Sequence, residues 1–218
     1  MKCPVLVLLL LGSIALGQRE FKIDDASKNV NIVAQVEQND PRFCGGKAKF
    51  SVFRKGVLKP IQVIFLPNTY QLGEPPDCDS PSVDLGDFNF DGHDDLAISD
   101  GRNGGYGSAS YQIYLYSKAS RRFVHSPAFS KIAQFPSLGM FHVDKKKRML
   151  FRYSKEGCCW HQDDGFIVSG GQPKKVYEKV EDAWATTRGS DKITITTRRL
   201  IHGRWRTWKK VIKNSESQ

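Results

Sequence analysis

A series of short runs, in which apolar residues alternate with polar ones or are β-branched, constrains the fold of this chain most strongly. The runs occupy residues 30–33, 47–53, 61–66, 111–116, 148–153 and 192–197. Gly, Pro, Asn, Asp or Lys residues bound them, for example at 54–56, 75–77 and 170–171. Alternation is typical of strands with one buried face, and short strands about ten residues apart are typical of antiparallel all-β domains.

We therefore predict an all-β fold: one antiparallel domain of many short strands, built as a sandwich, a barrel or an irregular propeller-like meander. Hydrophobic residues make up 39% of the 218 residues, which is enough for a packed core and excludes a disordered chain. No low-complexity linker divides the sequence, so we expect the domain to extend over residues 18–218. One short helical turn is expected at residues 126–130.

The first 17 residues have the pattern of a secretory signal peptide. Lys2 provides a positive start, residues 5–11 are apolar, and the small residues of 15–17 suit cleavage before Gln18. The apolar run is too short to span a membrane, and Cys3 precedes it, which argues against a lipid anchor. We expect a periplasmic or secreted protein without a membrane span, whose formal charge falls from +10 to +9 when Lys2 is lost.

Four cysteines remain after this cleavage, and an oxidising compartment favours two disulfides. We prefer Cys44–Cys78, which leaves Cys158 and Cys159 as a vicinal pair. Cross-pairing of the Cys158-Cys159 dipeptide to Cys44 and Cys78 stays open as the alternative. A zinc site is the weaker interpretation because no C-x-x-C spacing occurs.

Residues 87–95, here called the aspartate loop, carry the strongest chemical pattern. Asp87, Asn89 and Asp91 alternate, so their side-chain oxygens can converge when the loop curls, and Gly92 permits a tight bend. A hard cation such as Ca²⁺ needs several oxygen ligands. The loop predicts a structural Ca²⁺ site.

Two further residues complete the expected calcium ligands: the main-chain carbonyl of His93 and the carboxylate of Asp95. The loop differs from an EF-hand, because its twelfth position is Ile98 and strand-like residues flank it. Mg²⁺ is the weaker candidate, since it prefers a smaller octahedral shell. The alternative interpretation is an acidic hairpin loop stabilised by Asx turns.

With residues 83–86 before it and 96–98 after it, the aspartate loop resembles the calcium loop of FG-GAP/VCBS-type β repeats. A wider stretch, about residues 60–184, resembles exported bacterial proteins similar to periplasmic lysozyme inhibitors. That group includes a Xanthomonas immunity protein against a peptidoglycan hydrolase delivered by a type IV secretion system. The resemblance rests on the glycine- and serine-rich segment 104–111, the tyrosines of 114–116 and the turn at Ser126-Pro127.

In proteins of this inhibitory type, a Ser/Gly loop with a Tyr enters the lysozyme cleft and binds its catalytic carboxylates. The resemblance implies that Gly107 allows close approach, that Ser108 donates from its hydroxyl, and that Tyr111 is a second donor or an anchor. It also implies a lysozyme-like peptidoglycan hydrolase as the protein partner. The alternative is an ordinary turn, with Tyr111 as a core aromatic residue.

The chain carries no catalytic motif such as G-x-S-x-G or H-E-x-x-H, and we predict that it is not an enzyme. His161, Asp163 and Asp164 could form a metal or acid–base cluster, but a surface loop is the preferred interpretation.

The segment 198–210 is basic and contains Trp205 and Trp208. It could bind nucleic acid, lipopolysaccharide or an acidic protein. We favour a terminal hairpin that turns near His202-Gly203, with both tryptophans packed and the charges solvated, and we expect no nucleic-acid partner.

These patterns together predict an exported, calcium-stabilised protein that inhibits a peptidoglycan-cleaving enzyme. A charge of +9 would repel a basic lysozyme, so either the target is acidic or the acid-rich region 77–100 docks on it. The alternative is a calcium-dependent surface or adhesion module that binds a cell-envelope glycan or polymer. A hydrolase with an unfamiliar site is a further alternative.

Overall fold

The structure is a computed structural model, and it describes residues 18–23, 27, 29–38, 40, 42–74, 77–184 and 191–213. The predicted signal peptide, residues 1–17, lies outside the described residues. No helix in the described part of the chain is long and apolar enough to span a membrane.

The described chain forms three antiparallel sheets, and in each sheet every strand pairs with its neighbour in sequence. The first sheet contains β1 (Gln18–Ile23), β2 (Val30–Gln38), β3 (Gly45–Arg54) and β4 (Gln62–Tyr70). The middle sheet contains β5 (Val83–Gly86), β6 (Asp95–Gly101), β7 (Ser110–Ser117) and β8 (Arg122–His125). The third contains β9 (His142–Asp144), β10 (Met149–Glu156), β11 (Trp160–Ser169), β12 (Gln172–Asp182), β13 (Lys192–Ile201) and β14 (Arg204–Lys213).

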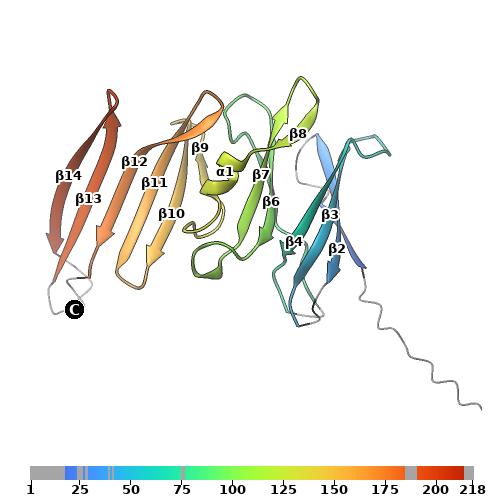
Figure 1. Cartoon of the computed structure of the whole chain (residues 1–218), viewed down its shortest axis with the longest axis horizontal. Helices are drawn as coiled ribbons and strands as arrows, with labels where there is room; N and C mark the ends of the chain where they lie inside the picture. The colour runs from blue at the N-terminus through green and yellow to red at the C-terminus, as the bar shows by residue number, and fades with distance from the viewer. Residues whose placement is uncertain are drawn as a thin grey trace, which may run out of the picture.

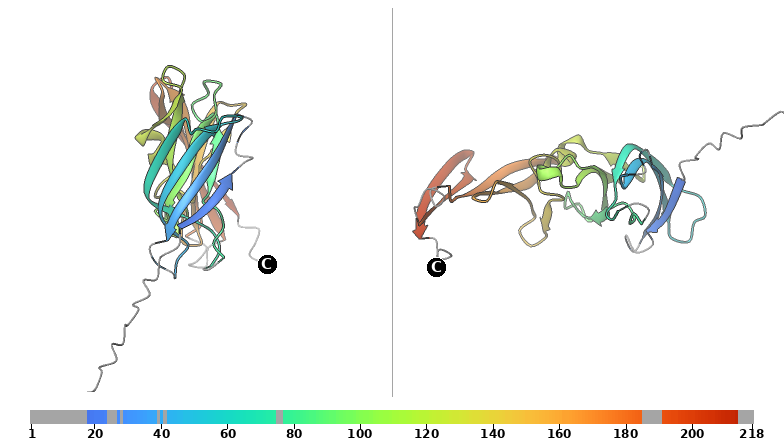
Figure 2. Two further views of the ribbon diagram at one scale, coloured as in Figure 1. Left: turned by 90° about the vertical axis from the view of Figure 1, so that its right-hand side faces the viewer. Right: turned by 90° about the horizontal axis from the view of Figure 1, so that it is seen from below.

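The three sheets stand in a row, with the middle sheet covered on both faces (Figure 1; Figure 2). Strand β6 shows how the sequence produces this arrangement. Leu96 and Ile98 belong to the core cluster shared with the first sheet, whereas Ala97 between them belongs to the cluster shared with the third. Because successive side chains point to opposite faces, a strand that is apolar throughout is buried on both sides.

The predicted antiparallel all-β fold is confirmed, and no sheet closes into a barrel within the described ranges. Four of the six runs singled out in the sequence lie wholly within strands, and the runs 61–66 and 148–153 each begin one residue before β4 and β10. The expected helical turn is α1 (Pro127–Ile132), which has Ser126 at its N-cap and packs Phe129 into the second core cluster.

Both disulfides have the preferred pairing. Cys44–Cys78 has an S–S distance of 2.08 Å and joins the segment before β3 to the connection that leads to β5. Cys158 and Cys159 bond to each other in the turn between β10 and β11.

The third sheet extends beyond the other two, so β13 and β14 are the last strands of the row (Figure 1). The hairpin turns at His202-Gly203 as predicted, but the prediction that its tryptophans are packed is wrong. Trp205 is 39% exposed and Trp208 is 48% exposed. The reason is that, within the described residues, no further layer covers this end of the sheet.

Candidate functional site

The aspartate loop connects β5 to β6, and its sequence alternates between two environments. Phe88 and Phe90 are buried in the second core cluster, where the Phe88 ring meets the Phe141 ring edge-on at 5.4 Å. The Arg148 guanidinium donates to the Phe90 carbonyl at 2.7 Å. The phenylalanines therefore anchor the loop, and the polar residues between them are left to face one another.

Asp87, Asn89 and Asp91 are gathered around main-chain amides of the loop. The Asp91 amide donates to the Asp87 Oδ1 at 2.9 Å and to the Asn89 Oδ1 at 3.0 Å. The Gly92 amide donates to the second Asp87 oxygen at 2.9 Å, and the His93 amide donates to the Asp91 Oδ1 at 2.9 Å. These contacts are the Asx-turn network that the alternative interpretation describes.

Asp95 is fully buried, and main-chain amides occupy both of its carboxylate oxygens. Oδ2 accepts from the Phe88 amide at 2.9 Å and the Asn89 amide at 3.2 Å, and Oδ1 accepts from the Tyr116 amide at 2.8 Å. Burial raises the pKa of Asp95 to about 6, although the three amides favour the charged form. Asp95 thus fastens the base of the loop to β7.

The fit of a calcium ion can be judged from these contacts. Three side chains at alternate positions converge, as the sequence predicts, and Asp87 and Asn89 turn oxygens toward the same amide. Asp95 contributes less, because Oδ2 already accepts two hydrogen bonds and only Oδ1 keeps an unused lone pair. Within the described ranges, no three His, Cys, Asp or Glu side chains form a ready metal-binding group. The side chains that fit best are therefore Asp87, Asn89 and Asp91.

A groove of about 690 Å³ lies beside the aspartate loop, between the first and middle sheets. His93 and Asp94 line it from the loop, and its remaining charged residues are basic: Arg54, Lys55, Lys118 and Arg121. Among the residues that line the groove, only Asp94 of the aspartate loop is acidic.

The glycine- and serine-rich loop, residues 101–109, connects β6 to β7. Its Ser108 hydroxyl is half-buried and donates to the Ser137 carbonyl at 3.2 Å. Tyr111 is buried in the second core cluster, and its hydroxyl lies 3.0 Å from the Ser82 hydroxyl. Ser108 and Tyr111 therefore hold the loop in place, and neither presents a free donor to the outside.

The exposed residues of this loop are Arg102, Asn103 and Tyr106, and Gly107 is half-buried. Tyr106 is 64% exposed and has a positive φ of 54°, which turns its side chain outward. The Arg102 Nε donates to the Gly107 carbonyl at 2.8 Å, while its guanidinium stacks on the Tyr70 ring at 5.3 Å. The Gly157 amide, next to the vicinal disulfide, donates to the Tyr106 hydroxyl oxygen.

The neighbouring segment 133–141 braces the loop. The Gly105 amide donates to the Ser137 carbonyl at 2.7 Å, and the Phe135 amide donates to the Asn103 carbonyl at 3.0 Å. Gly105 has no room for a side chain, since a Cβ would lie 2.7 Å from the Pro136 carbonyl oxygen. The loop is therefore held on two sides, with an aromatic residue at its tip.

The two predicted sites lie at opposite ends of the middle sheet. Strand β6 begins at Asp95, next to the aspartate loop, and ends at Gly101, where the glycine- and serine-rich loop begins. Seven residues of extended strand separate them by about 20 Å. A calcium ion bound at the aspartate loop could therefore stabilise the glycine- and serine-rich loop only through the strands of the middle sheet.

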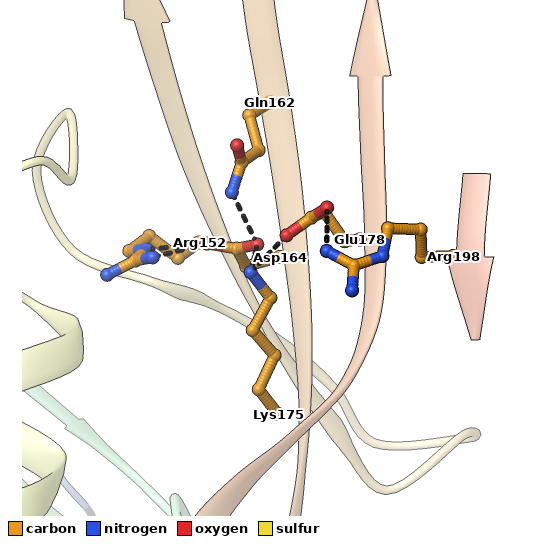
Figure 3. Close-up of polar contacts among 6 residues, drawn as sticks. All are labelled: Arg152, Gln162, Asp164, Lys175, Glu178 and Arg198. Carbon is orange, nitrogen blue, oxygen red and sulfur yellow. Dashed lines mark hydrogen bonds and ion pairs between the residues drawn. The ribbon is translucent and has the colours of Figure 1, made fainter. Parts of the chain in front are cut away.

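A buried ionic network lies on the inner face of the third sheet (Figure 3). Asp164 on β11 is fully buried and contacts Arg152 of β10, while its Oδ1 lies 2.6 Å from the Lys175 Nζ of β12. The Gln162 Nε2 donates to the same Oδ1 at 2.7 Å. Burial alone would raise the pKa of Asp164, but the hydrogen bonds from Lys175 and Arg152 outweigh it and hold that pKa below its usual value.

Glu178 continues this network toward the exposed strands, with Oε2 at 2.6 Å from the Lys175 Nζ and Oε1 at 3.1 Å from the Arg198 guanidinium. The surface-loop interpretation of residues 161–164 is therefore wrong, because these residues are part of strand β11. Strand alternation places His161 and Asp163 on one face and Asp164 on the other. The three residues do not form one cluster.

Comparison with solved structures gives a counterpart for the fold. The chain is similar to the solved structure of a Xanthomonas protein described as related to a type IV secretion system. The two match with a TM-score of 0.62 and 21% sequence identity, over 90% of this chain and 96% of the Xanthomonas chain. At this level of identity the likeness is one of fold. No protein-family model matches the sequence, and no curated protein matches it.

Sequence reasoning missed Tyr106 as the exposed aromatic residue of the loop and Asp164 as the centre of a buried network. The flanking glycines were a usable signal for Tyr106, because a residue between tight turns is pushed outward. Nothing local in the sequence distinguishes Asp164 from Asp163, since the difference depends on which face of β11 is covered.

Proposed function

We propose that this protein is exported, has no catalytic activity, and inhibits a peptidoglycan-cleaving enzyme of the lysozyme type. The fold supports this proposal because it matches a Xanthomonas protein described as related to a type IV secretion system. The resemblance of the sequence to exported lysozyme-inhibitor-like proteins points the same way. Inhibition would serve either as lysozyme defence or as immunity against a secreted antibacterial enzyme.

The observation that carries the proposal is the braced, exposed tip of the loop between β6 and β7. Tyr106 and Arg102 present donors there, and the loop backbone is fixed by hydrogen bonds before any partner arrives. A preordered loop loses little entropy on entering a cleft. Charge-assisted hydrogen bonds to catalytic carboxylates contribute about 1.5–3 kcal/mol each.

The proposal modifies the roles of the residues expected at this site. Tyr106 and Arg102 would contact the enzyme, and the Gly107 backbone would permit close approach. Ser108 and Tyr111 would act as anchors of the loop, which is one of the two roles expected for Tyr111.

Calcium belongs to the proposal as a structural ion at the aspartate loop. Asp87, Asn89, Asp91 and the His93 carbonyl would hold it, and the ion would supply positive charge that neutralises the converging oxygens. Asp95 would keep the loop fastened to β7.

Inhibition can be tested with the exported chain against a panel of lysozyme-type peptidoglycan hydrolases, measured as clearing of a cell-wall suspension. We expect at least one enzyme to be inhibited, and Tyr106→Phe together with Arg102→Ala to weaken that inhibition by 10-fold or more, since each lost donor contributes about 1.5 kcal/mol or more. Tyr153→Phe is the matched control, because Tyr153 is also an exposed tyrosine but lies on the third sheet.

Two outcomes would contradict the proposal. Clearing of the suspension by the protein alone would reveal an enzyme. If the Arg102 and Tyr106 variant inhibits as strongly as the unsubstituted protein, the enzyme must be bound by a surface other than this loop.

A further inference from the structure

The strand register shows which residues share the outer face of the third sheet, the face directed away from the middle sheet. Paired residues in antiparallel strands point to the same side. Phe151 pairs with Gly165, Gly165 with Tyr177, Tyr177 with Arg199, and Arg199 with Arg206. Trp208 and Lys210 lie on the same side as Arg206, two and four residues further along β14.

The opposite, inner face carries the buried residues Leu150, Phe166 and Asp164. It also carries Arg198, Trp205 and Lys209, which alternate with the outer residues along β13 and β14. The two faces of this hairpin can therefore be altered separately, by substitutions only one residue apart.

An apolar hollow of about 670 Å³ lies on the outer face. Met149, Phe151, Tyr177 and Ile201 line it, and the Phe151 and Tyr177 rings meet edge-on at 6.2 Å. Gly165 lets these side chains pack close to the backbone of β11, because a Cβ at this position would lie 2.8 Å from the Met149 Cε and 2.9 Å from the Tyr177 Cβ. Asp163 is the one carboxylate that lines the hollow, together with Lys147, Lys179 and Arg199.

Beside the hollow runs a strip of exposed cations, the outer cationic strip: Arg199, Arg204, Arg206 and Lys210. Among the described residues none of the four forms an ion pair, and Arg199 contacts only the Tyr177 ring, at 5.6 Å. Trp208 lies within the strip and is 48% exposed.

The inner face of the same hairpin is different, because two of its cations are neutralised. Arg198 pairs with Glu178 at 3.1 Å, and Lys213 pairs with Asp191 at 3.4 Å. Cations on an edge strand discourage aggregation on either face. That general role does not explain why the unpaired cations gather on the outer face, next to the apolar hollow.

We propose that the outer face of the third sheet is a docking surface for membranes rich in anionic phospholipid. The outer cationic strip would contact the lipid phosphates, and Trp208 would lie at the level of the headgroups, where tryptophan is favoured. The hollow lined by Phe151 and Tyr177 would receive apolar lipid groups. This surface is separate from the loop between β6 and β7.

A bilayer accounts for this face better than a soluble polyanion does. A polyanion without aromatic or apolar groups, such as polyphosphate, would be bound by cations alone, and the apolar hollow and Trp208 would contribute nothing to its affinity. Interfacial binding uses both apolar burial and attraction between cations and anionic headgroups. A second copy of the chain is disfavoured, because its own strip would bring like charges together.

The test is cosedimentation of the exported chain with vesicles of phosphatidylglycerol and phosphatidylcholine, compared with vesicles of phosphatidylcholine alone. We expect binding to the anionic vesicles only, and weaker binding as salt is added. Each cation near an anionic surface contributes about a 5-fold gain, so Arg206→Glu/Lys210→Glu should weaken binding by at least 30-fold. Trp208→Ala should weaken it as well.

Matched controls come from the inner face of the same strand. Lys209→Glu/Lys213→Glu makes the same change in net charge, and Trp205→Ala removes the other tryptophan of this hairpin; both variants should retain most of the binding. Thermal melting of each variant separates loss of the surface from loss of the fold. The Arg206→Glu/Lys210→Glu variant should still inhibit the hydrolase. A negative result in the vesicle experiment therefore does not contradict the proposed function.

Three results would overturn the inference: no binding to anionic vesicles, equal binding to neutral vesicles, or equal loss from substitutions on the two faces. Complete competition by soluble inorganic polyphosphate at physiological salt, with Trp208→Ala unaffected, would also overturn it, because a soluble polyanion would then account for the surface.

Discussion

At the scale of single residues, the adjacent carboxylates Asp163 and Asp164 illustrate how one step along a strand changes chemistry. Asp164 faces inward, where Lys175 and Arg152 hold its charge. Asp163 faces outward, and burial raises its pKa while Lys179 opposes that rise. Identical side chains thus acquire opposite shifts in pKa.

We expect Asp164→Asn to lower the free energy of unfolding by about 3 kcal/mol, because it leaves the buried Arg152 and Lys175 without their shared anion. Urea unfolding at pH 7 would measure this loss. Asp163→Asn, on the other face of the same strand, is the control and should change stability by less than about 0.5 kcal/mol.

The acid sensitivity of this network follows from the sign of the pKa shift. The pKa of Asp164 in the folded protein lies below its usual 3.8, so its contribution is complete above about pH 4 and is lost as the pH falls through the folded-state pKa. Asp164→Asn should therefore make stability fall less steeply below pH 4. An unchanged pH profile would show that Asp164 does not control this part of the curve.

Calcium binding is a second prediction at this scale. Saturating Ca²⁺ should raise the melting temperature of residues 18–218 by about 5 °C or more, since ligand binding stabilises only the folded state. Asp91→Ala should abolish that rise. Asp94→Ala should retain it, because Asp94 is exposed and lies outside the alternating set.

The calcium-induced shift is the informative quantity, since Asp91 also accepts the His93 amide and its loss lowers stability without any ion. No shift in the unsubstituted chain would favour a loop held by Asx turns alone.

At the scale of elements, the strands were predictable because the alternation that defines them is local. Residues 47–53, for example, lie within β3, residues 62–66 lie within β4, and the short helix follows Ser126. The order in which sheets cover one another was not predictable. Alternation at Leu96, Ala97 and Ile98 shows that both faces of β6 are apolar, but not which sheet covers each face.

The candidate site shows the same limit. Ser108 and Tyr111 were assigned to the loop between β6 and β7 by resemblance, and the loop is there. Whether a tyrosine at either end of such a loop faces inward depends on the sheet behind it: Tyr111 begins β7 and enters the core, whereas Tyr106 stands on a turn with positive φ.

Gly165 provides a prediction for the third sheet as an element. Gly165→Ala should lower the free energy of unfolding by about 1–3 kcal/mol, because the new methyl group would overlap the Met149 side chain and the Tyr177 Cβ. Adding Met149→Ala should recover only part of this loss, since the Tyr177 Cβ belongs to a fixed strand. Denaturant melts of the single and double variants would measure both effects, and full recovery would contradict the geometry.

At the scale of the whole molecule, the middle sheet shares a core cluster with each outer sheet, so we expect the three sheets to unfold as one cooperative unit. Phe50 is buried between the first and middle sheets, and Phe129 is buried between the middle and third. We expect Phe50→Ala and Phe129→Ala each to lower the free energy of unfolding by about 3–5 kcal/mol.

Tryptophan fluorescence tests whether the sheets unfold together, because it reports on the third sheet alone. Trp160, Trp205 and Trp208 lie in that sheet, and Trp184 follows β12. Phe50→Ala changes the far side of the molecule. If the sheets unfold together, the fluorescence transition should shift by the same amount as the circular dichroism transition. A fluorescence transition that does not move would mean that the third sheet unfolds independently.

The pairing of every strand with its immediate neighbour has a consequence for the order of assembly. A chain that crosses a membrane from its N-terminus emerges one hairpin at a time, and each new strand finds its partner already outside. Both cysteines of the 34-residue Cys44–Cys78 loop have emerged before any strand of the third sheet exists. Short-range pairing favours rapid folding. Under the proposed export, the molecule can therefore assemble during translocation, with each finished sheet serving as the template for the next.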